Sequence, residues 1–300
     1  MEKPELSKYA VILATHNPSD TILDKVNHSI QLLLAQDLKV YLIASGNKQT
    51  MKKIAVILRY HSIFLKLGKL SYNSVLNKGI PQKWNLGIER AIYEGADILS
   101  LLTDDSSPNS SYNTSEIIEY FTNNCKVTDL MSLPSNLSSL ISDHKRIFIS
   151  DIGMTFHRKL YEKLRFDEEL VHSFTDYKFS FTVVTKLGGN IVIYPKRVID
   201  VSEPITESNE VVYLPEWTLY LVFRNSIYWA FSEKQIKYKL LILGLFYFLS
   251  FPKWLYRSFR ARRSIKQVTR AIIVGTLDGL LGNTGITTNL HVISDGRFRI

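Results

Sequence analysis

The sequence predicts an α/β fold, a mixed sheet flanked by helices, followed by a C-terminal helical region. The first half of the 300-residue chain alternates short apolar runs of strand type with longer stretches of helical spacing. The first apolar runs are continuous, as in strands that are buried on both faces of a sheet. From Pro215 onward helical patterning dominates. We therefore expect an α/β domain at 1–208 and a helical region at 209–300, with the boundary where Pro204 and the polar residues 206–210 interrupt the pattern.

The strands and helices are predicted in an order typical of such a domain. Helix 81–94 has a proline in its first turn and Gly95 just past its end, an asymmetry that favours a helix. Strand 97–102 is an apolar run that leads directly into two aspartates. In chain order, we predict strands at 9–14, 39–44, 72–76, 97–102, 130–133, 146–149 and 191–194, and helices at 22–35, 49–60, 81–94, 116–123, 156–164 and 176–187.

The composition indicates a globular protein and excludes several other classes. Apolar residues make up 45% and charged residues 22% of the chain, which is unlike disordered or fibrous proteins. The single cysteine, Cys125, excludes an internal disulfide bond and a cysteine-based zinc site. The first apolar run, 9–14, is too short for a signal peptide, so we expect a cytoplasmic protein whose Asn-X-Ser/Thr motifs carry no sugar.

The positive charge is concentrated in one segment. The net charge of the chain is +9, and residues 231–270 contain ten basic side chains against one acidic, Glu233, so the remainder is neutral. Within this basic segment, the uncharged run 240–252 has 13 residues, fewer than the roughly 20 that a helix needs to cross a bilayer. Aromatic and basic residues are interleaved in 253–263, a pattern typical of a segment in the lipid headgroup region.

The basic segment predicts peripheral binding at the inner face of the cell membrane, with each cation contributing about 1 kcal/mol near an anionic leaflet. A core helix followed by a solvated basic helix is the structural alternative. Binding to nucleic acid is disfavoured, because no recognition module accompanies the charge. Whether the chain forms a homo-oligomer is left open by the sequence.

Asp104 and Asp105 form the most informative candidate site, because they follow a buried strand directly. Ligands of open α/β sheets bind outside the carboxyl ends of the strands. Two adjacent carboxylates suit a divalent cation, Mn²⁺ or Mg²⁺, which proteins hold with one or two carboxylates plus substrate phosphates. The alternative is structural, since Asp-Asp-Ser-Ser-Pro is a good turn sequence by itself.

Two further positions are candidates on local grounds. Thr15, His16 and Asn17 follow the first strand at the same edge of the sheet, where they could bind a nucleotide or shape the turn. Asp176 lies in the first turn of a predicted helix, where a carboxylate usually interacts with the helix dipole and could instead act in catalysis. Glycine-rich phosphate loops of the Walker or dinucleotide type are absent, so those modes of nucleotide binding are disfavoured.

Seven segments are informative as an ordered set, and they are Val11–Pro18, Asn77–Ile88, Gly95–Pro108, Asp151–Gly153, Phe166–Leu170, Tyr220–Asn225 and Gly275–Gly285. Together they resemble the inverting, family-2 type glycosyltransferases of the GT-A fold. Within that group, they are most similar to the branch of rhamnosyltransferases and galactofuranosyltransferases. The resemblance covers most of the chain, which extends the α/β prediction to a GT-A fold.

The resemblance implies transfer of a rhamnose-like or galactofuranose-like sugar from a nucleotide-diphosphate sugar to a hydroxyl of a glycan or lipid-linked glycan, with inversion at the anomeric carbon. It implies that Asp105, together with Asp104, binds the metal and that Asp176 is the catalytic base. It assigns the nucleotide-sugar to Thr15, Asn17, Ser45, Asn85 and Asp104, and the acceptor region to Asp151, Gly153 and Arg224.

Three departures from the family pattern bear on these roles. The Asp expected after the second strand is replaced by the Ala-Ser pair 44–45, so recognition of the base must differ. Thr103 stands at the first Asp of the metal motif, which leaves Asp105 as the metal ligand and Asp104 for ribose or metal. The segment 200–204 lacks the His ligand that many relatives supply, so a carboxylate replaces it or metal binding is weaker. These departures keep a second interpretation open, a catalytically inactive GT-A-fold scaffold at the membrane.

Overall fold

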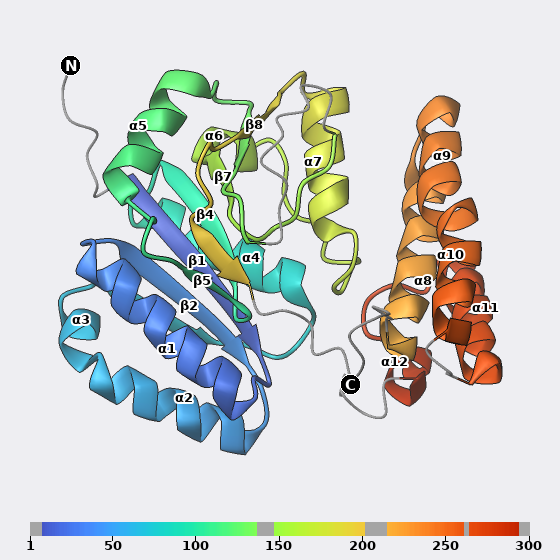
Figure 1. Ribbon diagram of the computed structural model, residues 1–300, viewed down its shortest axis with the longest axis horizontal. Coiled ribbons are helices and arrows are strands. Elements are labelled where there is room, and N and C mark those ends of the chain that lie inside the picture. Colours follow the sequence, from blue (N-terminus) through green and yellow to red (C-terminus); the bar gives the residue numbers. More distant parts are fainter. Residues whose placement is uncertain (1–7, 137–146, 202–214, 261–263, 294–300) are drawn as a thin grey trace. The chain divides into compact units, whose positions relative to one another are not determined.

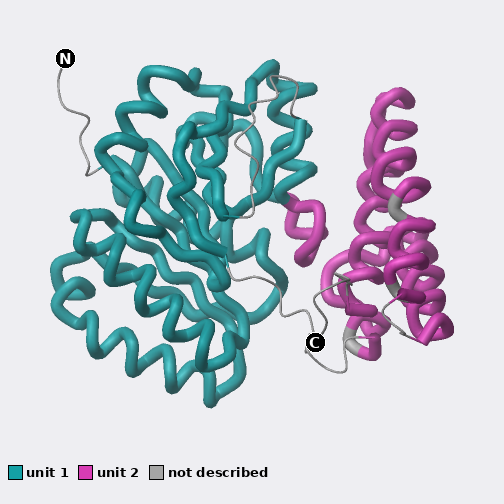
Figure 2. The backbone as a smooth tube through the Cα atoms, viewed as in Figure 1, with its two compact units in different colours: residues 1–166, 176–202 teal, residues 167–175, 203–300 magenta. Residues whose placement is uncertain are grey.

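The computed structural model describes residues 8–136, 147–201, 215–260 and 264–293. Its backbone divides into two units, which are coloured separately in Figure 2. Unit 1 comprises Met1–Phe166 and Asp176–Ser202, and unit 2 comprises Asp167–Thr175 and Glu203–Ile300. The predicted boundary at 208 lies outside the described residues. The sequence did not predict that 167–175 belongs with the C-terminal unit.

The described strands of unit 1 are β1 (Tyr9–His16), β2 (Lys39–Ser45), β3 (Leu70–Ser74), β4 (Ile98–Thr103), β5 (Ser106–Pro108), β6 (Leu130–Ser132), β7 (Met154–His157), β8 (Ile191–Ile193) and β9 (Ile199–Val201). Seven of them form a mixed sheet in the order β3-β2-β1-β4-β7-β6-β8 (Figure 1). Neighbours among β1 to β4 pair in parallel, and β7 runs antiparallel to both β4 and β6. A second sheet consists of β5, which follows β4 in the chain, and β9, which pairs with it antiparallel.

The described helices of unit 1 are α1 (Asp20–Ala35), α2 (Lys48–Tyr60), α3 (Ser62–Lys66), α4 (Ile80–Tyr93), α5 (Thr114–Asn124), α6 (Arg158–Tyr161) and α7 (Thr175–Lys186), which starts with the last residue of 167–175. Successive side chains of a strand point to opposite faces of the sheet. Val11 therefore packs in the core cluster that contains the buried residues of α1, and Ile12 packs in the cluster that contains those of α4. The predicted α/β class, with a mixed sheet flanked by helices, is confirmed.

Two predicted elements near residue 150 are wrong. The predicted strand 146–149 is irregular where it is described, and the predicted helix 156–164 starts within β7 and contains only the short α6. The cause is a turn at Gly153, whose φ is +73° and whose added Cβ would lie 2.6 Å from Ile199 Cδ1. A glycine is needed there for both reasons. The apolar run that follows is too short for its periodicity to separate a strand from a helix.

Unit 2 is helical, as predicted, and its described helices are α8 (Glu216–Ser232), α9 (Ile236–Ile242), the π-helix η2 (Leu243–Phe248), α10 (Ser250–Arg260), α11 (Ile265–Leu281) and α12 (Thr288–Ile293). The backbones of α8 and α11 approach each other closely. A Cβ added to Gly275 would lie 2.4 Å from the Tyr220 carbonyl oxygen, and one added to Gly279 would lie 2.5 Å from that of Arg224. Two glycines one helical turn apart thus create the contact surface of α11.

The basic segment 231–270 contains one helical run, from α9 through η2 to α10. Its portion Ile236–Arg257 has 22 residues and contains an 18-residue window with a mean hydropathy of 1.2, so by length and composition alone it is the one described helix that could cross a membrane. The sequence-based estimate was shorter, because it counted only the uncharged run 240–252. Arg262 and Arg263 lie outside the described residues.

Candidate active site

Four predicted nucleotide-binding residues lie at one edge of the main sheet of unit 1. Strand β1 lies between β2 and β4, and all three are parallel, so their carboxyl ends are neighbours. Thr15 Oγ1 donates a hydrogen bond to Asp104 Oδ2 at 2.6 Å, and the His16 backbone N–H donates to the same oxygen at 3.2 Å. Ser45 Oγ lies 3.0 Å from His16 Nδ1. Asn17, in the loop after β1, is the fourth of these predicted nucleotide-binding residues.

Asn17 is exposed at the same edge and fixes the loop after β1. Its φ is +44°, in the left-handed region that Asn tolerates better than most residues. Its Oδ1 accepts a hydrogen bond from the Asn47 backbone N–H at 2.8 Å, and its own N–H donates to the Ser45 carbonyl oxygen at 3.1 Å. The loop after β1 is therefore tied to the end of β2.

A buried lysine that the sequence did not single out extends this edge. Lys83, in the first turn of α4, is 1% exposed and donates to Asn77 Oδ1 at 3.3 Å. Asn77 Nδ2 in turn lies 3.2 Å from His16 Nε2. Burial lowers the pKa of Lys83 to about 8, and the charge of Asp104 partly opposes this shift. Burial also raises the pKa of Asp104, against the two hydrogen bonds from Thr15 and His16. The edge thus places a basic and an acidic side chain together in a buried setting.

Three carboxylates of unit 1 meet beside this edge. Asp105 follows β4, Asp151 lies in the turn before β7, and Asp176 lies in the first turn of α7. Asp105 Oδ1 accepts a hydrogen bond from Thr103 Oγ1 at 2.5 Å. Burial is the main cause that raises the pKa of Asp151 and of Asp176. The charge of Asp105 adds to the shift of Asp151, and the charge of Asp151 adds to the shift of Asp176. The structure therefore brings the predicted metal ligand and the predicted base into one group, the carboxylate cluster Asp105, Asp151 and Asp176.

The surroundings of Asp176 favour its neutral form. Burial raises its pKa well above the ordinary value, and the charge of Asp151 adds to the shift. The backbone N–H groups of Tyr177, at 2.9 Å, and of Asp151 donate to the Asp176 carboxylate and oppose the shift. Burial also raises the pKa of Asp151, whose carboxylate accepts hydrogen bonds from Trp84 Nε1 at 3.4 Å and Ser150 Oγ at 3.2 Å. A carboxylate with a raised pKa accepts a proton more readily, as a general base must.

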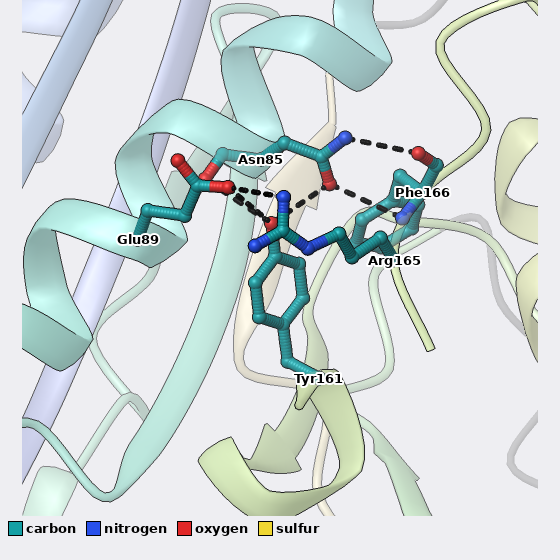
Figure 3. A network of polar contacts seen from close by, with 5 residues as sticks. All are labelled: Asn85, Glu89, Tyr161, Arg165 and Phe166. Carbon is teal, nitrogen blue, oxygen red and sulfur yellow. Dashed lines mark hydrogen bonds and ion pairs between the residues drawn. The ribbon is translucent and has the colours of Figure 1, made fainter. Parts of the chain in front are cut away.

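Asn85 lies inside unit 1, where its amide group faces the backbone of Phe166 (Figure 3). Its Nδ2 donates to the Phe166 carbonyl oxygen at 2.9 Å, and its Oδ1 accepts from the Phe166 N–H at 3.1 Å. The Tyr161 hydroxyl donates to the same Oδ1 at 3.1 Å, and Glu89 forms an ion pair with Arg165 at 2.9 Å. These contacts give Asn85 a structural role just before 167–175, and its contact with a nucleotide stays a prediction.

The residues expected in the acceptor region have different positions. Asp151 belongs to the carboxylate cluster, and Gly153 forms the turn that carries it. Arg224 is fully buried in unit 2, where its Nε donates to Asn225 Oδ1 at 2.9 Å and its Nη1 donates to the Gly285 carbonyl oxygen at 2.6 Å. These contacts give Arg224 a structural role within unit 2, and its contact with an acceptor stays a prediction.

Comparison with known proteins identifies the fold. No protein-family model matches the sequence, and no curated protein matches it. Among solved structures, the chain is similar to S. aureus TarS 1–349 in complex with UDP-GlcNAc, with a TM-score of 0.57 and 13% identity over 95% of this chain and 83% of that one. The fold is that of the GT-A glycosyltransferases.

Two more solved structures support this GT-A assignment. The mannosyltransferase PcManGT from Pyrobaculum calidifontis, in complex with GDP-Man and Mn²⁺, has a TM-score of 0.55 and 12% identity over 97% of this chain and 84% of that one. GalNAc-T7 with UDP, GalNAc and Mn²⁺ has a TM-score of 0.53 and 12% identity over 75% of this chain and 51% of that one.

The carboxylates of this GT-A fold suit a metal that is shared with a ligand. The described residues contain no group of three or more His, Cys, Asp or Glu side chains that could hold a metal ion by themselves. Asp105 and Asp104 supply hard oxygen donors, and the repulsion between Asp105 and Asp151 favours a cation near them. The set fits Mn²⁺ or Mg²⁺ held by one or two carboxylates, with substrate phosphates as the other ligands. Asp200, on β9, instead accepts a hydrogen bond from Asn109 Nδ2 at 3.3 Å, and residue 203 lies outside the described part of the chain.

Proposed function

We propose that this protein is a glycosyltransferase that moves a sugar from a nucleotide-diphosphate sugar to a hydroxyl group. The observation that carries the proposal is the position of the carboxylate cluster Asp105, Asp151 and Asp176 beside the sheet edge formed by Thr15 and Asp104. The GT-A neighbours were solved with UDP-GlcNAc, with GDP-Man and with UDP. A nucleotide-sugar donor at this edge is consistent with all of them.

The donor would bind at the carboxyl ends of β1, β2 and β4. Thr15, Asn17, Ser45 and Asp104 present hydroxyl, amide and carboxylate groups there, and the buried ammonium of Lys83 adds a positive charge. Polar groups of this kind fix the orientation of a ligand in an otherwise apolar site. The resemblance in the sequence favours a rhamnose-like or galactofuranose-like sugar, and we retain this finer assignment as part of the proposal.

A divalent cation fits Asp105, with Asp104 as a second ligand shared with Thr15. Two of the neighbours were solved with Mn²⁺. When bound, such an ion neutralises the negative charge that develops on the leaving diphosphate. Asp104 also stays hydrogen-bonded to the loop after β1, so this loop and the metal ligands form one unit.

Asp176 would act as the general base. The proton of the acceptor hydroxyl moves to the Asp176 carboxylate while the hydroxyl oxygen bonds to the anomeric carbon and the bond to the diphosphate breaks. Such a single displacement inverts the configuration at the anomeric carbon. The raised pKa of Asp176 strengthens it as a proton acceptor. Asp151 and the turn at Gly153 would line the acceptor side.

The basic segment 231–270 would place the enzyme at the cytoplasmic face of the membrane, next to a glycan or lipid-linked glycan acceptor. Large apolar side chains project from it into solvent, with Leu240 62% and Phe248 66% exposed. Lys253 and Arg257 lie over the Trp254 ring, at 5.5 and 5.0 Å from its centre. An exposed apolar face flanked by cations suits a helix that lies in the headgroup region. We propose this interfacial orientation and not a membrane-spanning one, because basic residues lie within the helical run and not only beyond its ends.

The test is release of nucleoside diphosphate by the full chain from UDP-, GDP- and dTDP-sugars, with Mn²⁺ or Mg²⁺ and without acceptor. We expect slow, metal-dependent hydrolysis of at least one donor. The variant Asp176→Asn should lose it, whereas the control Asp24→Asn, on the exposed side of α1, should retain it. Binding of a donor without hydrolysis, with or without added glycan acceptors, would instead favour the inactive scaffold.

A further inference from the structure

The loop 167–175 belongs to the helical unit, although the residue that follows it is the proposed base. Asn225 Nδ2 on α8 donates to the Ser173 carbonyl oxygen at 2.7 Å. The Gly285 backbone N–H donates to the Glu169 carbonyl oxygen at 3.1 Å. Unit 2 therefore holds both halves of this loop by hydrogen bonds to the loop's carbonyl oxygens, and one peptide bond joins the loop to Asp176.

Phe174, two residues before Asp176, has a strained backbone. Its φ is +71°, in the left-handed region that bulky residues avoid. Such a conformation persists only where the surrounding structure enforces it, and it is found preferentially at functional sites. The contacts that enforce it therefore bear on the position of Asp176.

Two aromatic rings from different helices hold Phe174. The Phe246 ring, on η2, meets it edge-on at a centre-to-centre distance of 4.7 Å, and the Trp229 ring, on α8, lies at 6.5 Å. Trp229 and Phe246 also contact each other at 5.8 Å. We call these three residues the Phe174 cluster. Edge-on aromatic pairs at such distances add stabilisation beyond the burial of their surface.

The helix that supplies Phe246 also carries the exposed apolar face. Around Phe246 the chain is a π-helix, with the Leu249 N–H bonded to the Gly244 carbonyl oxygen at 3.1 Å. Phe248 and Leu249 are 66% and 65% exposed. Short π-helical stretches within α-helices are frequently found at functional sites. Within this short segment, Phe246 thus contacts the loop, whereas Phe248 and Leu249 are exposed to solvent.

We propose that an anionic lipid surface, by binding the α9–η2–α10 run, fixes the Phe174 cluster and thereby positions Asp176. The cations of the run, Lys237, Lys239, Lys253 and Arg257 among them, match the charge of such a surface. A ligand shifts a conformational equilibrium only by binding one state more tightly. Here the favoured state is the one in which η2 holds Phe246 against Phe174. The proposal rests on the proposed function only for the role of Asp176.

Hydrogen exchange of the full chain tests the coupling without any catalytic assay. Backbone exchange of 170–178 is measured with and without vesicles of phosphatidylcholine and phosphatidylglycerol. Vesicles should slow exchange in the wild type several-fold. Phe246→Ala should bind the vesicles but gain no protection there. The matched control Phe248→Ala, on the lipid side, should bind more weakly and show wild-type exchange without vesicles.

Several outcomes would overturn the proposal. Failure of the wild type to bind the vesicles, unchanged exchange of 170–178 in the bound state, or equal protection in Phe246→Ala would each contradict it. Where Phe246→Ala does not fold, Phe246→Leu keeps the apolar bulk and removes the ring edge, and the same outcomes apply to it.

Turnover supplies a second, independent readout. Vesicles should raise kcat of the wild type without changing KM for the donor, and Phe246→Ala should lose this rise, because Phe246 is a positioning residue that touches no substrate. A lipid-dependent change in exchange without turnover of any nucleotide-sugar would leave the coupling intact and refute the proposed function. Turnover that changes neither with vesicles nor with Phe246→Ala would support the proposed function and refute the coupling.

Discussion

Asp176 carries a carboxyl group whose charged form the folded protein disfavours. Burial and the charge of Asp151 raise its pKa, while the backbone N–H groups of Tyr177, Asp151 and Asp176 itself lower it. The folded state therefore holds this proton more tightly than the unfolded chain does, so its contribution to stability falls as the pH rises through the folded-state pKa. The same raised pKa that lowers folding stability at higher pH makes the Asp176 carboxylate a stronger base.

Asp176→Asn should separate activity from stability. Without the base, turnover should fall by about 10²–10⁴-fold, while donor binding is retained. The melting temperature at pH 7 should rise, because a buried charge next to Asp151 is removed. Steady-state kinetics and thermal unfolding check the two effects. A variant with near-normal turnover, or one that melts well below the wild type, would contradict the assignment.

The pH dependence of turnover should report the repulsion between two carboxylates. Asp176 acts in its charged form, so activity should be lost as the pH falls through its raised pKa. Asp151→Asn removes a neighbouring charge and should lower that pKa, which moves the acidic limb of the kcat/KM profile to lower pH. An acidic limb that does not move in Asp151→Asn would show that another group controls it.

Several site residues could be predicted from the sequence, because each follows a strand end or starts a helix. Thr15, Asp104 and Asp176 are of this kind. The resemblance assigns Asn85 to the nucleotide-sugar and Arg224 to the acceptor region, but a motif does not reveal that hydrogen-bond partners within the protein already surround both side chains. Lys83 was missed, although the cue was available: it is a charged residue within the resembling segment, close to the start of a helix whose Trp84 and Ile88 are buried.

At the scale of elements, the α8–α11 pair depends on the absence of side chains at two positions. Gly279→Ala would place a Cβ 2.5 Å from the Arg224 carbonyl oxygen. We expect a loss of about 1–3 kcal/mol of stability, typical of overpacking. The control Gly244→Ala adds a Cβ that meets nothing within 4 Å, so it should be neutral or stabilising. Denaturant titration of both variants measures these changes in stability. Equal stabilities would contradict the close approach of α8 and α11.

The elements themselves were predictable to different degrees. The parallel strands β1, β2 and β4 were found because each is an apolar run followed by a polar loop, whereas β3 is mostly polar and was predicted two residues too late, at 72–76. The antiparallel strand β7 was not, because its four residues carry no periodicity of their own and depend on pairing with β4 and β6. The loop 167–175 shows the same limit, since tertiary contacts and not its composition assign it to unit 2.

At the scale of the whole molecule, the net charge of +9 resides in the segment 231–270. Lys253→Ala combined with Arg257→Ala should weaken binding to anionic vesicles by about 2 kcal/mol, or about 30-fold. Added salt should weaken the wild type as well. The matched control, Lys48→Ala with Lys52→Ala on exposed positions of α2, removes the same charge from unit 1. An equal loss in both variants would argue for net charge and against a lipid-binding segment.

Calorimetric titration of nucleotide-sugars into the wild type, Asp105→Ala and Asp176→Asn, with and without Mn²⁺, tests the proposed donor site most directly. We expect the wild type and Asp176→Asn to bind one donor more tightly with Mn²⁺, and Asp105→Ala to lose that enhancement. If no nucleotide-sugar binds the wild type, or if Asp105→Ala retains the full effect of Mn²⁺, the carboxylates at this edge of the sheet do not form a donor site.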